Sequence, residues 1–237
     1  MNKISLALVF LISLSMFSCE KAIKGTGGIV DETRSLEPFN ELELNGMINA
    51  SFKQVKSTAL DKVVVSAQEN LLPYIKTTVD NGLLIINIER TIRTDKDVLV
   101  EIYGHPFRSL VCNGSGDVRS DERIMLQKLY LESNGSGDVS LDLEAKSIEV
   151  ELNGSGDVSF SGSTDYLELV SNSSGDLNTI EMRSFEVDVL SNGSGDVSAY
   201  AKESFDVEIN GSGDVYHMGK AELTKSLNGT GLLKTKK

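Results

Sequence analysis

The sequence predicts an all-β protein built as a β-solenoid, in which successive coils of the chain stack on one another. One observation is a motif of the form Asn-Gly-Ser-Gly-Asp, which occurs seven times between residues 113 and 232, counting a degenerate last copy. A second is its spacing, because successive Asn residues lie 21, 19, 19, 20, 18 and 18 positions apart. A third is the alternation of apolar and polar residues around each copy, which is typical of strands with one buried face.

Composition limits the class of function. The chain has 237 residues, 40% of them apolar, and a formal net charge of -12. An acidic chain repels phosphate backbones, so we expect no nucleic-acid partner. Two Cys and two His residues are too few for a structural zinc site or a disulfide framework. We therefore predict no bound metal and no cofactor.

The N-terminus has the features of an export signal. Residues 4–17 form an apolar or small-residue run, shorter than the roughly 20 residues of a transmembrane helix. The Ser18-Cys19 pair that follows resembles the end of a bacterial lipobox. We expect residues 1–18 to be a lipoprotein signal peptide, Cys19 to carry the lipid, and residues 19–28 to be a tether. A plain signal peptide with an incidental cysteine is the alternative.

The remaining chain divides where the repeat begins. Residues 29–110 lack the motif but are rich in strand patterns, and they form either the first coils or a small subdomain. Within them, Asp80-Asn81-Gly82 predicts a hairpin turn. Only Glu69–Lys76 has a helical pattern, which Pro73 limits to about one turn. Residues 111–237 form the repeat solenoid.

The seven motifs are predicted to be turns. Asn and Gly tolerate positive φ, stacked Asn side chains can form amide ladders, and Asp can accept backbone N–H groups. The second Gly of the motif is never replaced, so we predict that it holds the positive φ. The turn residues assigned this structural role are Asn113, Gly116, Asp117, Asn134, Gly137, Asp138, Asn153, Gly156, Asp157, Asn172, Gly175, Asp176, Asn192, Gly195, Asp196, Asn210, Gly213 and Asp214.

Alignment on the motif favours stacked coils over a meander of hairpins. The positions five and three residues before each Asn, and five residues after it, are apolar except near the ends, where Arg108 and Lys225 occur. Stacked in parallel, these positions become continuous core columns with tolerant end coils. A meander, the alternative, would place identical turns alternately at opposite edges of the sheet.

The pattern resembles the head GIN domain family of auto-transporter adhesins on bacterial surfaces. The resemblance rests on the segments Glu37–Gly46 and Glu69–Leu72 and on the repeated Gly-Ser-Gly-Asp-Val, and it spans residues 29–233. It implies a right-handed parallel β-helix with coils of about 18–21 residues. It implies an adhesive role but brings no shared active site to carry over.

Several sharper chemical interpretations compete with structural ones. The repeated Asp residues could contribute ligands to Ca²⁺, which takes 6–8 oxygens, but we expect them to cap turns instead. His105 and His217 lie at the two ends of the repeat block, so a catalytic pair is not expected. Each motif also matches the Asn-x-Ser/Thr glycosylation sequon, and the turn itself explains the Asn. Outward strand positions carry an acidic stripe, which we interpret as a solvated face: Glu132, Glu149, Glu151, Glu168, Asp188, Asp206 and Glu208.

These observations predict a non-enzymatic lipoprotein of the bacterial cell envelope. We expect it to be lipid-anchored to the outer membrane and surface-exposed, with a glycan or protein as its extracellular ligand. A periplasm-facing structural or stress-related scaffold is one alternative. A β-helix carbohydrate-active enzyme is the other, although the short, uniform turns leave little from which to build a catalytic cleft.

Overall fold

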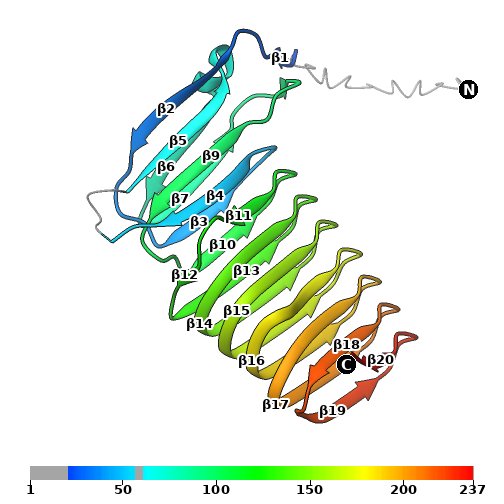
Figure 1. Ribbon diagram of the computed structural model, residues 1–237. Coiled ribbons are helices and arrows are strands. Elements are labelled where there is room, and N and C mark those ends of the chain that lie inside the picture. Colours follow the sequence, from blue (N-terminus) through cyan, green and yellow to red (C-terminus); the bar gives the residue numbers. More distant parts are fainter. Residues whose placement is uncertain (1–20, 57–60, 237) are drawn as a thin grey trace, which may run out of the picture.

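Parallel strands stack coil upon coil along one axis in the computed structural model (Figure 1). The structure describes residues 21–56 and 61–236. The predicted signal peptide and Cys19 lie outside these residues. The N-terminal strands lie at one end of the stack and the C-terminus at the other (Figure 1).

Each repeat coil has two limbs, joined by a sharp turn at one edge and a rounded bend at the other (Figure 1). A long strand such as β14 leaves one motif, runs along one face, rounds the bend and returns along the other face. The strands of the repeat block are β13 (Lys128–Ser133), β14 (Val139–Leu152), β15 (Val158–Ser171), β16 (Leu177–Ser191), β17 (Val197–Ile209), β18 (Val215–Gly219), β19 (Glu222–Leu227) and β20 (Leu233–Thr235).

Strand register confirms the solenoid and excludes the meander for the repeat block. β14 pairs with β15 in parallel, from Val139 opposite Val158 to Leu152 opposite Ser171. Equivalent residues of successive coils are therefore neighbours. The register shifts between β15 and β16 and between β16 and β17, near the bend. These shifts absorb the differences in coil length, so the motifs remain aligned.

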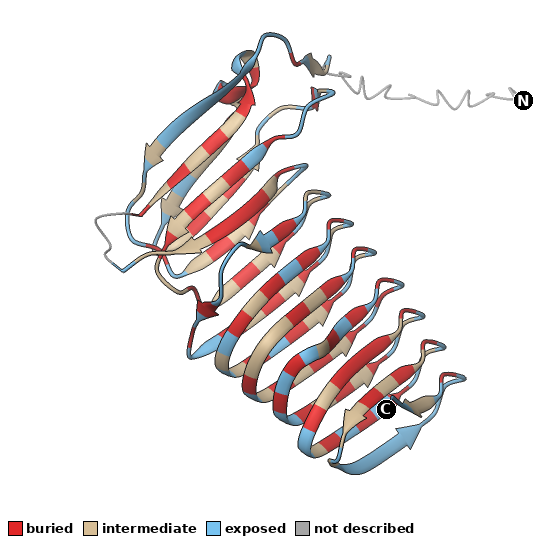
Figure 2. Cartoon of the chain, in the orientation of Figure 1, coloured by how far each residue is buried: buried red, intermediate tan, exposed pale blue. Residues whose placement is uncertain are grey.

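The apolar columns form the core, as predicted. Residues alternate between buried and less buried positions along both limbs (Figure 2). Leu131, Leu167 and Val158, for example, are fully buried, whereas Leu223 in the last coil is 43% exposed. Burial of these columns is the main stabilising contribution expected, since the described part of the chain holds no disulfide. Cys112 is a free thiol within this core, and burial raises its pKa to about 12.

A further coil precedes the repeats in space. β3 (Glu41–Leu44) and β4 (Asn49–Gln54) pair in parallel with β10 (Ser109–Cys112) and β11 (Val118–Ser120). The turn Asn45–Asn49 thus stands directly next to the first motif of the repeat. The chain leaves this coil after β4 and reaches the repeat block only at β10. The short strand β12 (Ile124–Met125) then pairs with β14.

The intervening chain builds the other end of the stack. β7 (Leu83–Ile88) and β9 (Leu99–Gly104) form one more coil, which pairs with β3 and β4. Antiparallel strands cover this coil, with β6 on β7, β5 on β9 and β2 on β5. These covering strands are β2 (Ile29–Ser35), β5 (Lys62–Gln68) and β6 (Ile75–Asp80).

Local predictions for this end are confirmed. Asn81 and Gly82 have φ of 50° and 86° in the turn between β6 and β7, as a tight hairpin requires. The one helical element among the described residues is a 3-10 helix, η2 (Glu69–Tyr74), which contains Pro73. The part of the predicted tether that is described lies against the body, since β1 (Ile23–Lys24) pairs with β8 (Ile92–Arg93).

Candidate functional site

The motif Asn residues form a continuous ladder along the turn edge. Each side-chain amide donates to the Oδ1 of the preceding Asn, as from Asn134 to Asn113 at 2.9 Å and from Asn153 to Asn134 at 3.1 Å. The ladder runs from Asn45 to Asn228. The predicted amide ladder is thus present, and it includes the turn at Asn45, which the sequence analysis did not count as a copy.

The Asp residues form a second ladder of a different kind. The Oδ1 of each Asp accepts the backbone N–H of the next Asp, as at 2.9 Å from Asp157 to Asp138 and 2.8 Å from Asp176 to Asp157. One carboxylate oxygen of each side chain is therefore committed to the turn. Within the described chain, no cluster of three or more metal-ligating side chains occurs.

The glycines of the motif have a different role from the one predicted. None of them has a positive φ, so the prediction of left-handed geometry at the second Gly is wrong. They are required because consecutive turns stack too closely for a side chain. A Cβ on Gly137 would lie 2.0 Å from the carbonyl oxygen of Gly116, and one on Gly156 would lie 2.1 Å from that of Gly137. The same clash recurs for Gly116, Gly175, Gly195, Gly213 and Gly231.

One turn departs from the pattern where Ser173 replaces the first Gly. In the neighbouring turns, the Ser amide bonds to the preceding coil, as from Ser155 to Gly135 at 2.9 Å. The equivalent amide of Ser174 makes no backbone hydrogen bond of this kind among the described residues. The buried Ser173 hydroxyl instead accepts the N–H of Gly175 within its own turn. The extra Cβ is accommodated by a local loss of contact between coils.

The acidic stripe lies on the face formed by the limbs that enter the turns. Two tyrosines lie among these carboxylates: Tyr130 donates to Glu132 and Glu151, and Tyr166 donates to Asp188 at 2.6 Å. Burial and the nearby carboxylates raise the pKa of Tyr130 to about 12. The hydrogen bond to Asp188 and burial raise that of Tyr166. The stripe is thus partly or fully exposed, and some of its carboxylates accept hydrogen bonds from neighbouring tyrosines.

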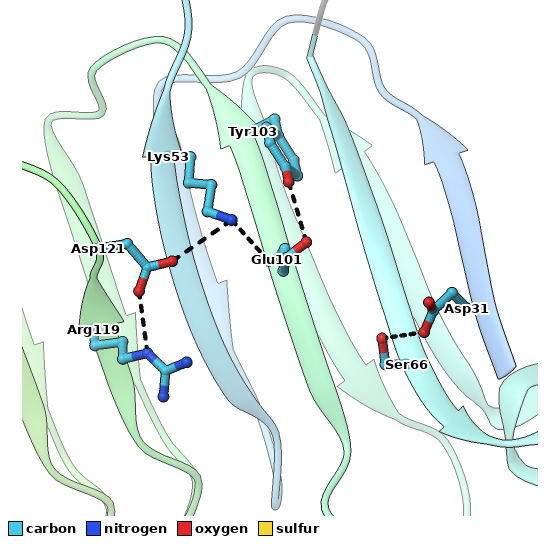
Figure 3. Close-up of polar contacts among 7 residues, drawn as sticks. All are labelled: Asp31, Lys53, Ser66, Glu101, Tyr103, Arg119 and Asp121. Atoms are coloured by element: carbon cyan, nitrogen blue, oxygen red, sulfur yellow. Dashed lines mark hydrogen bonds and ion pairs between the residues drawn. The ribbon is translucent and has the colours of Figure 1, made fainter. Parts of the chain in front are cut away.

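A polar hollow lies on the opposite face, where the repeat meets the N-terminal coils. Figure 3 shows four of its lining residues, together with the partners Lys53, Tyr103 and Asp121; the four are Asp31, Ser66, Glu101 and Arg119. Lys53 lies 2.8 Å from Glu101 and 3.6 Å from Asp121, and Asp121 also pairs with Arg119. The Tyr103 hydroxyl donates to the other Glu101 oxygen at 3.1 Å. The hydrogen bond from Lys53 lowers the pKa of Glu101, so this carboxylate is held ionised and oriented.

The two histidines do not form a pair. His105 lies in the connection between β9 and β10, where its Nδ1 is 3.2 Å from an oxygen of the buried Asp61. His217 is buried in β18 against the ring of Phe205, at the far end of the repeat block. Burial lowers the pKa of His217.

The polar hollow is not predicted by any pattern in the sequence. Its residues come from β2, β4, β5, β9 and β11, and they share neither a motif nor a spacing. A usable signal was the turn Asn45-Gly46, which starts like the repeat motif and would have placed β4 beside β11. Among the described residues, no helix is long and apolar enough to span a membrane.

Solved structures with the same fold come from species of Bacteroides and Parabacteroides. A "putative adhesin" from Bacteroides fragilis is 21% identical, with a TM-score of 0.84, and the match covers 91% of this chain and 100% of that one. A "putative lipid binding protein" from Parabacteroides distasonis is 20% identical, with a TM-score of 0.75 and coverage of 92% and 100%. A "putative adhesin" from Parabacteroides merdae is 16% identical, with a TM-score of 0.73 and coverage of 91% and 99%.

At these identities the likeness shows the fold alone. A comparison with curated proteins gives no match. The family model described as "Putative auto-transporter adhesin, head GIN domain" matches residues 38–221, from the strand before the first turn to the last coil. This match covers most of the chain and includes the two ladders as far as Asn210 and Asp214, together with the polar hollow's β4, β5, β9 and β11. The chain therefore belongs to the head GIN domain family of adhesin-like proteins.

Proposed function

We propose that the chain is a non-enzymatic lipoprotein of the bacterial cell envelope that binds a glycan or a protein through the outside of its solenoid. The main observation in support is that the outer surface of the solenoid consists of short turns and flat limbs. Its short turns and flat limbs bond to their own neighbours through the Asn and Asp ladders. Such a surface suits contact over an area, whereas turnover needs a cleft in which reactive groups converge.

The position of the two ends supports a lipid anchor. The described chain begins at one end of the stack and finishes at the other (Figure 1). A lipid on Cys19 would hold the first end near the outer membrane. The stack would then extend away from the membrane, with the last coil as its distal tip. Attachment at one end leaves both faces and the turn edge free for a ligand.

The adhesive role comes from the family and from its structural relatives. The family description and the names of the Bacteroides and Parabacteroides structures refer to adhesins. Those words apply to those proteins, and we extend them to this chain as a proposal. The acidic charge of -12 argues further for a ligand that is not polyanionic.

Protease treatment of intact cells tests the location. We expect the full-length protein to be degraded on intact cells, and a Cys19→Ala variant to be released from the membrane fraction. Protection until the outer membrane is permeabilised would overturn surface exposure and favour a periplasmic scaffold. A periplasmic marker protein is the control for membrane integrity.

Capture of immobilised ligands tests the binding role. Cells that express the protein should adhere to surfaces coated with polysaccharides or extracellular proteins more than cells of a deletion strain. The same coatings should show no shortened polysaccharide after incubation with the protein. Accumulation of cleavage products would overturn the non-enzymatic assignment.

A further inference from the structure

The polar hollow introduced above has the dimensions and lining of a small binding site. Its volume is about 340 Å³, within the range of ligand pockets in proteins. It lies where the antiparallel N-terminal strands meet the parallel repeat. Its lining includes Asp31, Ser51, Ser66, Leu99, Glu101 and Arg119.

Strand register explains how residues distant in sequence converge there. Asp31 stands opposite Ser66, and Ser66 opposite Leu99, in one row across β2, β5 and β9. In the next row, Ser51 stands between Glu101 and Arg119. Both rows point outward, because the alternate residues of these strands fill the core. No such convergence occurs along the repeat itself, where each row presents stacked copies of similar residues.

Ser51 forms the floor of the hollow. Its neighbours Ala50 and Phe52 point into the core, so the Ser51 side chain points outward. It is nevertheless only 6% exposed, because the flanking strands and their side chains rise around it. Its hydroxyl makes no hydrogen bond to any described residue. This oxygen is not among the fully buried polar atoms that lack a partner, so it reaches the surface of the hollow and is open to a ligand or to water.

The walls offer oriented acceptors and donors. Glu101 is held by Lys53 and Tyr103, and one oxygen of Asp31 is held by the Ser66 hydroxyl at 2.6 Å. The second oxygen of Asp31 has no bond to the described chain. Arg119 uses only its Nε, towards Asp121 at 3.3 Å, which leaves both terminal nitrogens free within the described residues.

We propose that this hollow binds one neutral pyranose unit of a glycan. Sugar hydroxyls both donate and accept, and so they match a site that offers carboxylate acceptors, a guanidinium donor and a serine hydroxyl. Leu99 is 41% exposed and supplies an apolar surface for the C–H face of a sugar ring. Asp31 and Glu101 disfavour an anionic ligand, and Lys53 and Arg119 disfavour a cationic one. This inference rests on the proposed function, since it names the ligand class of the same surface.

Titration with simple sugars tests the hollow. The probes are the methyl glycosides of glucose, galactose, mannose and N-acetylglucosamine. Binding to the full-length protein is detected by saturation-transfer NMR and by changes in the protein's chemical shifts. At least one glycoside should bind. Ser51→Leu, which fills the hollow, and Arg119→Ala, which removes a donor, should each raise its Kd by about 10-fold or more. Glu101→Gln is a milder variant that keeps the shape and should also weaken binding.

A matched control lies in the same coil as Arg119, in the connection between β11 and β12. Arg123 pairs with Asp142 at 2.8 Å outside the hollow, so Arg123→Ala should leave the Kd unchanged. Thermal unfolding of each variant separates loss of the site from loss of the fold. Failure of every glycoside to bind, or equal binding by wild type and Ser51→Leu, would overturn the inference. If glycosides do not bind but cells still capture polysaccharide or protein, only the inference fails; loss of all capture would remove the proposed function as well.

Discussion

The repeat block and the N-terminal coils obey the same stacking geometry but use it differently. In the repeat block, each outward or turn position lies beside a copy of itself, so Asn bonds to Asn and each Asp caps the next. The polar side chains of the turns therefore make their hydrogen bonds to neighbouring coils. At the junction with the N-terminal coils, unlike residues become neighbours, and Ser51 lies between Glu101 and Arg119. Repetition builds a stable support, and a potential ligand site arises where repetition stops.

The largest expected loss of stability comes from a variant that tests how closely the repeat turns are stacked. Gly156→Val should destabilise the fold by about 3 kcal/mol, because its Cβ would lie 2.1 Å from a backbone oxygen that cannot move without displacing the coil. Urea unfolding followed by circular dichroism measures the loss. The control outside the repeat is Gly28→Val, where a Cβ meets nothing within 4 Å. Equal stability of the two variants would show that the stacking distance does not require glycine.

The same clash shows why the sequence predicted the turn but not its cause. Period, apolar columns and the invariant Gly were sufficient to place the coils and the Asn ladder. Two mechanisms make Gly necessary, positive φ and close approach of another backbone, and both leave the same trace in a sequence. The structure distinguishes them, because no motif Gly has a positive φ and a Cβ on Gly137 would lie 2.0 Å from the carbonyl oxygen of Gly116.

The polar hollow could not be predicted from the sequence for a different reason from the role of the motif glycines. The turn Asn45–Asn49 lies beside Asn113, 68 residues away from its first Asn, because the chain builds a second coil before it returns. Pairing across such an insertion depends on the fold of the whole insertion and not on local pattern. Without β4 placed beside β9 and β11, nothing in the sequence brings Ser51, Glu101 and Arg119 together.

The next effect concerns the end of the repeat block and appears only in acid. His217 is 2% exposed, neither ring nitrogen has a partner among the described residues, and burial lowers its pKa. The unfolded chain, with its ordinary His pKa near 6.5, then binds protons that the folded chain does not. Stability present above that pH should therefore be lost as the pH falls below it.

Thermal melts of wild type and His217→Leu at pH 7.5 and pH 5 measure this effect. The melting temperature of the wild type should fall more between the two pH values than that of the variant. The comparison uses the difference between pH values, so any cost of repacking beside Phe205 cancels. An equal fall in both proteins would show that His217 is not the group responsible.

A smaller effect is expected from removing one rung of the Asn ladder. Asn153→Ala removes bonds to Asn134 at 3.1 Å and from Asn172 at 2.9 Å. Because the ladder is exposed, water replaces part of what is lost, and the free energy of unfolding should fall by about 1 kcal/mol. Asn228→Ala at the last rung removes a bond on one side only and should cost less. A larger cost at the last rung would contradict a ladder whose strength comes from bonding on both sides.

The smallest effect separates turn capping from metal binding. Asp157 accepts the N–H of Asp176 through Oδ1, and an amide oxygen at the same place can do the same. Asp157→Asn should therefore change the free energy of unfolding by less than about 1 kcal/mol, since only the charge is lost from an exposed site. Melting in the presence of Ca²⁺ and of a chelator gives the decisive measurement. If Ca²⁺ raised the melting temperature and Asp157→Asn abolished that rise, the Asp ladder would be a ligand set, and the repeat block would be a binding site in addition to a support.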